Sequence, residues 1–172
     1  MINQAIVGQY HASLSMLRTA LETCPDDLWD ASVGRHPFWL IGYHALFYAD
    51  MYLAGSQDAF SPPEFGRENE HYMEKLPFEP FEPYEAVEIG EPYQRQRLLD
   101  WCDKCRANVD KIVPAESAED LAAEADFPWM EFSRTECHLY NIRHIQHHVA
   151  QLSLELKFQT GTGVEWAGVA KK

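Results

Sequence analysis

Apolar residues recur at helical spacing near the start of the chain. Pro25 cannot continue a helix, so the pattern predicts a first helix that ends before it. Five apolar residues, separated by steps of four, four, three and four, share one face of this helix: Ile6, Tyr10, Leu14, Leu17 and Leu21.

A second helix is expected at residues 38–54. Pro37 suits the first position of a helix, and Gly55 is a natural helix stop. The longest apolar stretch of the segment is interrupted by His44 and ended by Asp50, well short of the about 20 residues that cross a bilayer. We therefore expect a buried helix and no association with a membrane.

Two more helices are predicted in the second half of the chain. One should end before Pro114 and the other should run from about Ser133 to Phe158, where the sequence GTG stops it. The core stripe of the third is Leu98, Cys102, Cys105, Val109 and Ile112, and that of the fourth is Ile142, Ile145, Val149, Leu152 and Leu156. No segment shows the pattern of a strand, so the predicted fold class is all-α with four helices.

Residues 56–92, between the second and third helices, differ in composition. They include six prolines and ten acidic residues against two basic ones, a net charge of −8. A solvated connection is the simplest interpretation. However, six aromatic residues are too many for a disordered linker, so we expect this crossover to pack over the helices, where it could act as a lid. These residues are Phe60, Phe65, Tyr72, Phe78, Phe81 and Tyr84.

Length and charge limit the classes of function. The 172 residues suit a single domain, 1–172, with a core that needs no disulfide. The net charge of −13 is unlike that of a protein that binds a phosphate backbone, so nucleic acid is not an expected partner. The N-terminal sequence lacks the features of a signal peptide, so we expect a cytoplasmic protein with its four cysteines reduced.

Two motifs were considered and set aside. Residues 101–105, WCDKC, resemble a redox motif, but Cys102 and Cys105 occupy the apolar stripe inside a helix, as small buried residues do. A di-iron site needs paired Glu-x-x-His motifs on helices, and the one match, Glu68 to His71, lies in the crossover.

Histidines carry the most informative pattern. His44 shares its helix face with apolar residues, but a single inward histidine is more often a hydrogen-bonded core residue than a metal ligand. His144 and His148 lie about 40° apart and about 6 Å along a helix, so their imidazoles can share a metal, although such pairs also arise by chance. His147 points away from the apolar stripe. A site of three histidines is therefore geometrically feasible, but spacing alone does not prove it.

The last helix contains HIQHHVAQL, residues 144–152. With the inward histidine and the long crossover, this H-x-x-H-H-x-x-Q-L element resembles the DinB/YfiT-like family of metal-binding four-helix bundles. The resemblance implies an up-down-down-up bundle with the crossover between helices two and three, frequent homodimers, and His44, His144 and His148 as metal ligands. Val149 and Ala150 replace a basic residue and a glycine that are frequent in the family, so the substrate pocket is expected to be particular to this branch.

Three histidine ligands leave tetrahedral zinc one open position, where bound water or a thiol becomes a nucleophile at neutral pH. The resemblance implies that some relatives are metal-dependent transferases or isomerases that use low-molecular-weight thiols. We therefore expect one divalent ion, zinc or nickel with iron also compatible, in a thiol S-transferase or hydrolase that acts on a small molecule. The alternative is a non-catalytic metal- or ligand-binding protein related to stress. The sequence identifies no catalytic residue.

Four residues share the helix face of the histidine pair, where an amide or carboxylate could orient an imidazole through its second nitrogen. Each is also explained as an ordinary residue at the margin of the bundle. The four are Cys137, Asn141, Gln151 and Glu155.

A second apolar line lies on the second helix, opposite His44. It consists of Trp39, Leu46 and Leu53. Because one bundle needs one apolar face per helix, this line predicts a homodimer, unless the crossover folds back and covers it.

Overall fold

Long α-helices make up most of the computed structural model, which describes residues 2–73 and 88–168. Four of them correspond to the predicted helices: α1 (Ile2–Thr23), α3 (Phe38–Ala54), α4 (Arg95–Ile112) and α6 (Arg134–Thr160). The all-α class is therefore confirmed. Glycines end α3 and α6 as expected: Gly55 and Gly161 adopt left-handed backbone, with φ of 89° and 81°, which disfavours residues with a Cβ.

Shorter elements occupy the connections between the long helices, and two of them are strands that the sequence did not predict. The others are α2 (Asp26–Trp29), η1 (Glu70–Tyr72), η2 (Val113–Ala115) and α5 (Ala118–Ala122). The expectation of no strand is wrong, because β1 (Ser32–Val33) pairs antiparallel with β2 (His36–Pro37) around Gly34, at φ 70°. Strands of two residues are too short to show an alternating pattern. Pro37 is the N-cap residue of α3 and not, as predicted, its first helical residue, which is Phe38.

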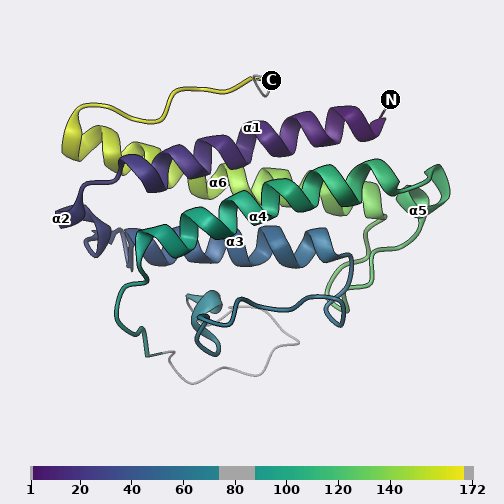
Figure 1. Cartoon of the computed structure of the whole chain (residues 1–172), viewed down its shortest axis with the longest axis horizontal. Helices are drawn as coiled ribbons and strands as arrows, with labels where there is room; N and C mark the ends of the chain where they lie inside the picture. The colour runs from purple at the N-terminus through teal and green to yellow at the C-terminus, as the bar shows by residue number, and fades with distance from the viewer. Residues whose placement is uncertain (1, 74–87, 169–172) are drawn as a thin grey trace.

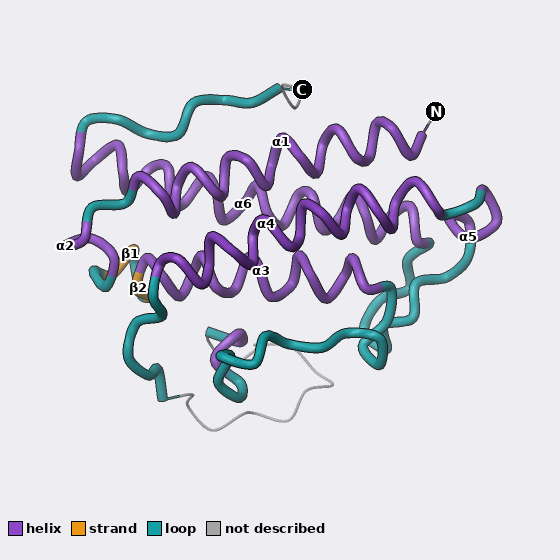
Figure 2. Tube along the Cα trace, in the orientation of Figure 1, coloured by secondary structure: helices purple, strands orange, loops and turns teal. Residues whose placement is uncertain are grey.

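The four long helices lie side by side (Figure 1). α1 and α3 each pack against both α4 and α6. In Figure 1, α3 and α4 run in one direction, and α1 and α6 run in the other. Figure 2 shows the small β1–β2 hairpin at one end of this layered group. The interior is apolar, and its fully buried side chains include Leu14, Leu46, Leu98 and Ile145.

α3 is buried on both of its apolar faces. Trp39, Leu46 and Leu53 are each 0% exposed within a single chain. The ring of Trp39 packs edge-on against Tyr93, with centroids 5.2 Å apart, and its Nε1 donates a hydrogen bond to Asp30. The chain itself covers this apolar line, so the line gives no reason for a partner and the homodimer stays a prediction.

The described parts of the crossover pack on the helices. Phe60 lies edge-on to Phe47 of α3, with ring centroids 4.9 Å apart. Phe65 packs against Tyr93 and Trp101 at 5.3 and 5.8 Å. The predicted lid residues Phe78, Phe81 and Tyr84 lie outside the described residues.

A buried carboxylate joins the two described parts of the crossover. Glu70 is 1% exposed. It accepts hydrogen bonds from the Tyr93 hydroxyl at 2.6 Å, from Gly90 N at 2.8 Å and from Arg67 Nε at 2.9 Å. Since a buried charge is costly unless it is paired, these donors hold residue 70 and its neighbours in a defined place.

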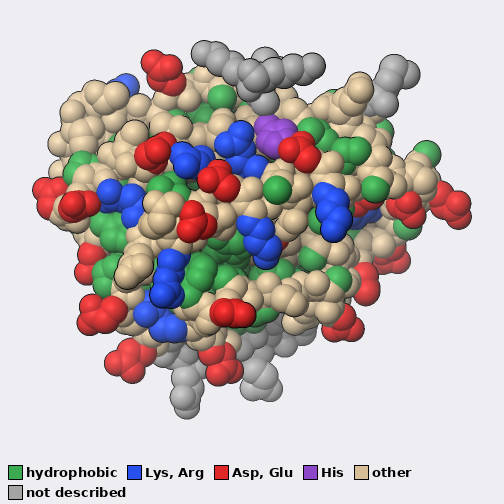
Figure 3. All heavy atoms as spheres, in the orientation of Figure 1, with side chains coloured by type: hydrophobic (Ala, Val, Ile, Leu, Met, Phe, Trp, Pro, Cys, Tyr) green, Lys and Arg blue, Asp and Glu red, His purple; other side chains and the backbone are tan. Residues whose placement is uncertain are grey.

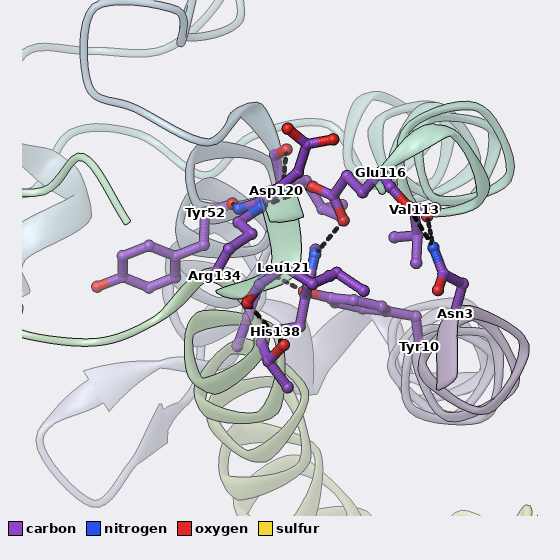
Figure 4. A network of polar contacts seen from close by, with 12 residues as sticks. Asn3, Tyr10, Tyr52, Val113, Glu116, Asp120, Leu121, Arg134 and His138 are labelled. Atoms are coloured by element: carbon purple, nitrogen blue, oxygen red, sulfur yellow. Dashed lines mark hydrogen bonds and ion pairs between the residues drawn. The ribbon is translucent and has the colours of Figure 1, made fainter. Parts of the chain in front are cut away.

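A polar network ties the N-terminal end of α6 to its neighbours (Figure 4). The Arg134 guanidinium donates to the carbonyls of residues 52–53 at the end of α3. Glu116 lies 2.7 Å from both Arg134 Nε and His138 Nε2, and His138 Nδ1 lies 3.0 Å from the Tyr10 hydroxyl. Although burial raises the pKa of Glu116, hydrogen bonds from His138 and Arg134 hold it below its ordinary value.

All four cysteines are free and buried, and Cys102 and Cys105 lie in the core as predicted. Burial raises the pKa of Cys102 to about 12 and that of Cys105 well above its ordinary value. Neither thiol forms a reactive thiolate at neutral pH, so the WCDKC segment is part of the core.

Charged side chains are mixed on the face drawn in Figure 3. Among the surface ion pairs, Arg18 pairs with Asp103 at 3.0 Å and Arg95 with Asp26 at 2.9 Å, so each of these positive charges has a carboxylate beside it. No helix in the part of the chain that the structure describes is long and apolar enough to cross a membrane.

Candidate metal site

The structure brings together the three histidines singled out in the sequence. His44 comes from α3, and His144 and His148 come from successive turns of α6. Nε2 of His144 lies 3.1 Å from Nε2 of His44 and 3.1 Å from Nε2 of His148. One nitrogen from each ring lies within 4.8 Å of the other two. Since zinc binds imidazole nitrogen at about 2.0–2.1 Å, one ion could contact all three rings after small movements.

The antiparallel packing of α3 and α6 explains why these side chains meet. Asn141 Nδ2 donates to the carbonyl oxygen of Ala49 at 3.0 Å, so residues 141 and 49 lie at the same height along the two helices. Five residues back along α3 lead to His44, and five residues forward along α6 lead to a point midway between His144 and His148. Both helices rise about 1.5 Å per residue, so the three imidazoles reach the same level.

Two of the histidines are oriented through their other ring nitrogen. His44 Nδ1 lies 2.6 Å from the backbone oxygen of His71, and His148 Nδ1 lies 2.8 Å from Oε1 of Gln151. These oxygens only accept, so each Nδ1 carries the proton and each Nε2 presents its lone pair. Metal-binding histidines are commonly held in this way.

His144 completes a set of nitrogens that a cation would satisfy. Its Nδ1 is buried and has no hydrogen-bond partner among the described residues. Its Nε2 can carry one proton at most, and so can donate to only one of its two neighbours, His44 and His148. At least two lone pairs therefore face each other. Three imidazoles form a donor set that suits zinc, nickel or iron.

Burial keeps the three imidazoles neutral. It lowers the pKa of His144 to about 3 and that of His148 to about 4, and it holds the pKa of His44 well below its ordinary value. The neighbouring imidazoles lower the pKa of His44 and His144 further, because a second positive charge nearby is unfavourable. At neutral pH a metal ion would not have to displace protons from these rings.

Of the four residues predicted to orient an imidazole, Gln151 contacts one of the three histidines through a hydrogen bond. Asn141 binds the Tyr10 hydroxyl and the Ala49 carbonyl, and so sets the helix register. Glu155 accepts a hydrogen bond from Gln159. Cys137 is buried.

Two histidines outside the trio have different surroundings. His147 is exposed, and its Nε2 lies 3.3 Å from Nε2 of Gln151. His71 was not predicted to contribute, yet its carbonyl orients His44 and its ring stacks on Phe47, with centroids 3.8 Å apart. A backbone acceptor in an irregular segment leaves no periodic signal in a sequence.

A pocket of about 440 Å³ opens beside the histidines. Its walls come from α3, the crossover, α6 and the loop before α6. The lining residues are His44, Phe47, Tyr48, Met51, Tyr52, Gln57, Phe60, Pro62, His71, Tyr72, Trp129, Tyr140 and His144. The volume falls within the range of about 300–1,000 Å³ typical of small-molecule sites.

The metal-free protein should lose stability in mild acid. Between its ordinary pKa of 6.5 and its folded-state pKa of about 3, His144 binds a proton in the unfolded chain but not in the folded one. Stability from this group is complete above pH 6.5 and falls as the pH drops toward 3. Replacing it by a residue that does not titrate, His144→Asn, should reduce the slope of unfolding free energy against pH by up to about 1.4 kcal/mol per unit.

Urea denaturation with a chelator, at several pH values from 7 to 4, measures this slope. Titrating groups that do not interact with His144 are common to both proteins and cancel in the comparison. The substitution also removes the repulsion that His144 exerts on a protonated His44. Equal slopes for His144→Asn and the parent protein would contradict the buried, neutral state of His144.

Comparison with known proteins places these features in a family. A model described as the DinB superfamily matches residues 9–152, a span that includes His44, His144 and His148. A search of curated proteins finds no match. The family match extends over well over half of the sequence and covers α3 and α4 completely and most of α1 and α6. The chain therefore belongs to the DinB superfamily.

Proposed function

We propose that the protein binds one divalent metal ion through the Nε2 atoms of His44, His144 and His148. The convergence of these three nitrogens, two of them with Nδ1 on an oxygen acceptor, carries the proposal. Zinc and nickel suit the imidazole set best, and iron is compatible with it.

A metal with three protein ligands has an open position, where it supplies a Lewis acid that lowers the pKa of bound water to about 7 or deprotonates a thiol. We infer that the protein is a metal-dependent thiol S-transferase or hydrolase acting on a small molecule. The pocket beside His44 and His144 supports this inference, because a substrate bound there would lie next to the ion.

A second candidate is a non-catalytic metal- or ligand-binding protein with a role in stress. One observation favours it: no Asp, Glu or Lys lines the pocket in the described parts of the chain, so a general base there would have to be His71 or a tyrosine. In the transferase, a thiol cosubstrate of low molecular weight would bring its own nucleophile.

We also infer an up-down-down-up bundle in a single domain, 1–172, that functions in the cytoplasm. The opposite directions of the α1/α6 and α3/α4 pairs support the topology. The four free, buried cysteines are compatible with a reducing compartment.

Alanine substitutions should separate the ligands from their neighbour. His44→Ala, His144→Ala and His148→Ala should each weaken zinc or nickel binding more than about 100-fold, because even loss of an outer partner of a ligand costs about 10- to 100-fold. Gln151→Ala should fall in that smaller range. His147→Ala should bind metal like the parent protein.

Metal analysis after dialysis and titration calorimetry measure occupancy and affinity. The rise in melting temperature with excess metal gives a second readout that should survive His147→Ala and vanish in His148→Ala. Normal binding by His148→Ala together with loss of binding in His147→Ala would require a different ligand set.

Turnover distinguishes the two candidate functions. Protein loaded with zinc or nickel should consume a thiol together with an electrophile, or hydrolyse an ester or amide, in a screen of small molecules. The activity should disappear with a chelator and in His144→Ala. Tight binding of screen compounds without any turnover would favour the non-catalytic protein.

We propose a homodimer through the outer face of α6. An exposed stripe with spacings of four, four, three, four and four supports it: Leu139, Arg143, His147, Ala150, Leu154 and Phe158. The spacing reads the same in both directions, so two antiparallel copies related by a two-fold axis would be complementary. Leu139, which is 56% exposed, would contact the partner's Phe158, which is 75% exposed. Arg143 would lie beside the partner's Leu154 and Glu155.

A charge placed on this stripe should dissociate the dimer. Leu154→Arg would put a second positive charge beside the partner's Arg143, near each end of the apolar contact, so sedimentation should find a monomer at micromolar concentration where the parent protein is a dimer. Ile2→Arg is the control, because Ile2 is also exposed, at 53%, but belongs to α1 and not to this stripe. A monomeric parent protein would rule out the dimer.

A further inference from the structure

The wall of the pocket beside the histidines is unusually rich in aromatic rings. Seven of its thirteen lining residues carry a Phe, Tyr or Trp ring: Phe47, Tyr48, Tyr52, Phe60, Tyr72, Trp129 and Tyr140. Among the described residues, no Lys, Arg, Asp or Glu lines it. Gln57 is the one lining side chain that carries an amide.

These rings support one another, so the wall is preformed. Tyr52 stands edge-on to Tyr140, with centroids 5.5 Å apart, which joins α3 to α6. Phe60 stands edge-on to Phe47, and His71 stacks on the same ring, which joins the crossover to α3. Such contacts fix ring positions, and a fixed apolar wall binds a ligand with little loss of conformational freedom.

Charge determines which ligands this wall accepts. In the metal-free protein, an anion would leave water for a site where no described residue offers a cationic side chain, in a protein of net charge −13. A cation would lie beside the proposed divalent ion and be repelled by it. An uncharged molecule meets neither penalty.

We propose that this pocket binds an uncharged small molecule through an aromatic ring system and directs its other end toward His44 and His144. The direction toward the metal rests on the proposed function. Binding of the ring system rests on the wall alone, and should therefore occur in the metal-free protein as well.

Two fluorescent probes that differ by one charged group test the proposal. N-phenyl-1-naphthylamine is uncharged, and 1-anilinonaphthalene-8-sulfonate has the same ring system with a sulfonate. Titrations of the full chain, with a chelator and with zinc, should give saturable binding of one uncharged probe per chain. With the chelator, the sulfonate should bind at least about tenfold more weakly, because it must desolvate a charge where no metal ion is present to attract it.

Variants locate the binding site. Phe60→Ala should weaken the uncharged probe roughly three- to tenfold, the range expected for one aromatic contact. Gln57→Lys changes an exposed side chain at the pocket and should raise sulfonate affinity relative to that of the uncharged probe. Trp166→Ala is the matched control, because Trp166 is 75% exposed and lines a separate groove between the C-terminal segment, α1 and α6.

The proposal fails if the sulfonate binds the metal-free protein as tightly as the uncharged probe does. It also fails if Trp166→Ala abolishes binding while Phe60→Ala leaves it unchanged. The two proposals can fail independently. If the protein binds the probe but takes up no metal ion, the metal-site proposal is wrong and the aromatic-pocket proposal stands. If it binds metal through the three histidines but does not bind the probe, the aromatic-pocket proposal is wrong and the metal-site proposal stands.

Discussion

The register of α3 against α6 is the constraint on which the rest of the site depends. Two polar contacts set it. Arg134 donates to the carbonyls of residues 52–53 in the last turn of α3, which have no donor four residues further on within the helix, and Asn141 donates to the Ala49 carbonyl in the middle of the interface. Both are buried, so a slip of one helix along the other would leave a guanidinium or an amide without partners in an apolar interior. This penalty makes the register specific in a way that interchangeable apolar contacts do not.

The same packing that positions the histidines also brings imidazole nitrogens with lone pairs close together when no metal is bound, which is unfavourable. Lone pairs from two rings face His144 across 3.1 Å, and burial prevents protonation from relieving their repulsion near neutral pH. The hydrogen bonds to the His71 carbonyl and to Gln151 hold two rings in this tautomer. The fold thus holds at least one imidazole nitrogen without a hydrogen-bond donor, an arrangement that a bound cation would stabilise, and local strain of this kind is common at functional sites.

Much of this arrangement was predictable from local patterns. Helix limits followed from Pro25, Gly55 and the glycine at 161, and the pairing of His144 with His148 followed from helical geometry. The position of His44 relative to that pair was not predictable from spacing, because it depends on the contact of Asn141 with Ala49. Family resemblance supplied what periodicity could not.

Features that depend on packing between distant segments could not be predicted from the sequence. Trp39, Leu46 and Leu53 predicted a homodimer, or a crossover that covers them, because a helix at the surface needs only one apolar face. α3 instead lies between neighbouring helices and the crossover, so all three residues are buried. The aromatic wall of the pocket could not be predicted from the sequence either, because its rings come from segments far apart in the chain that meet only in the folded protein.

The most direct test is a crystal of zinc-loaded protein measured with X-rays on both sides of the zinc absorption edge. The account predicts one strong anomalous peak in each chain, about 2.0–2.1 Å from Nε2 of His44, His144 and His148, with a fourth position open toward the aromatic pocket. A peak on a cysteine, on the acidic crossover or on His147, with the three-histidine site empty, would contradict it.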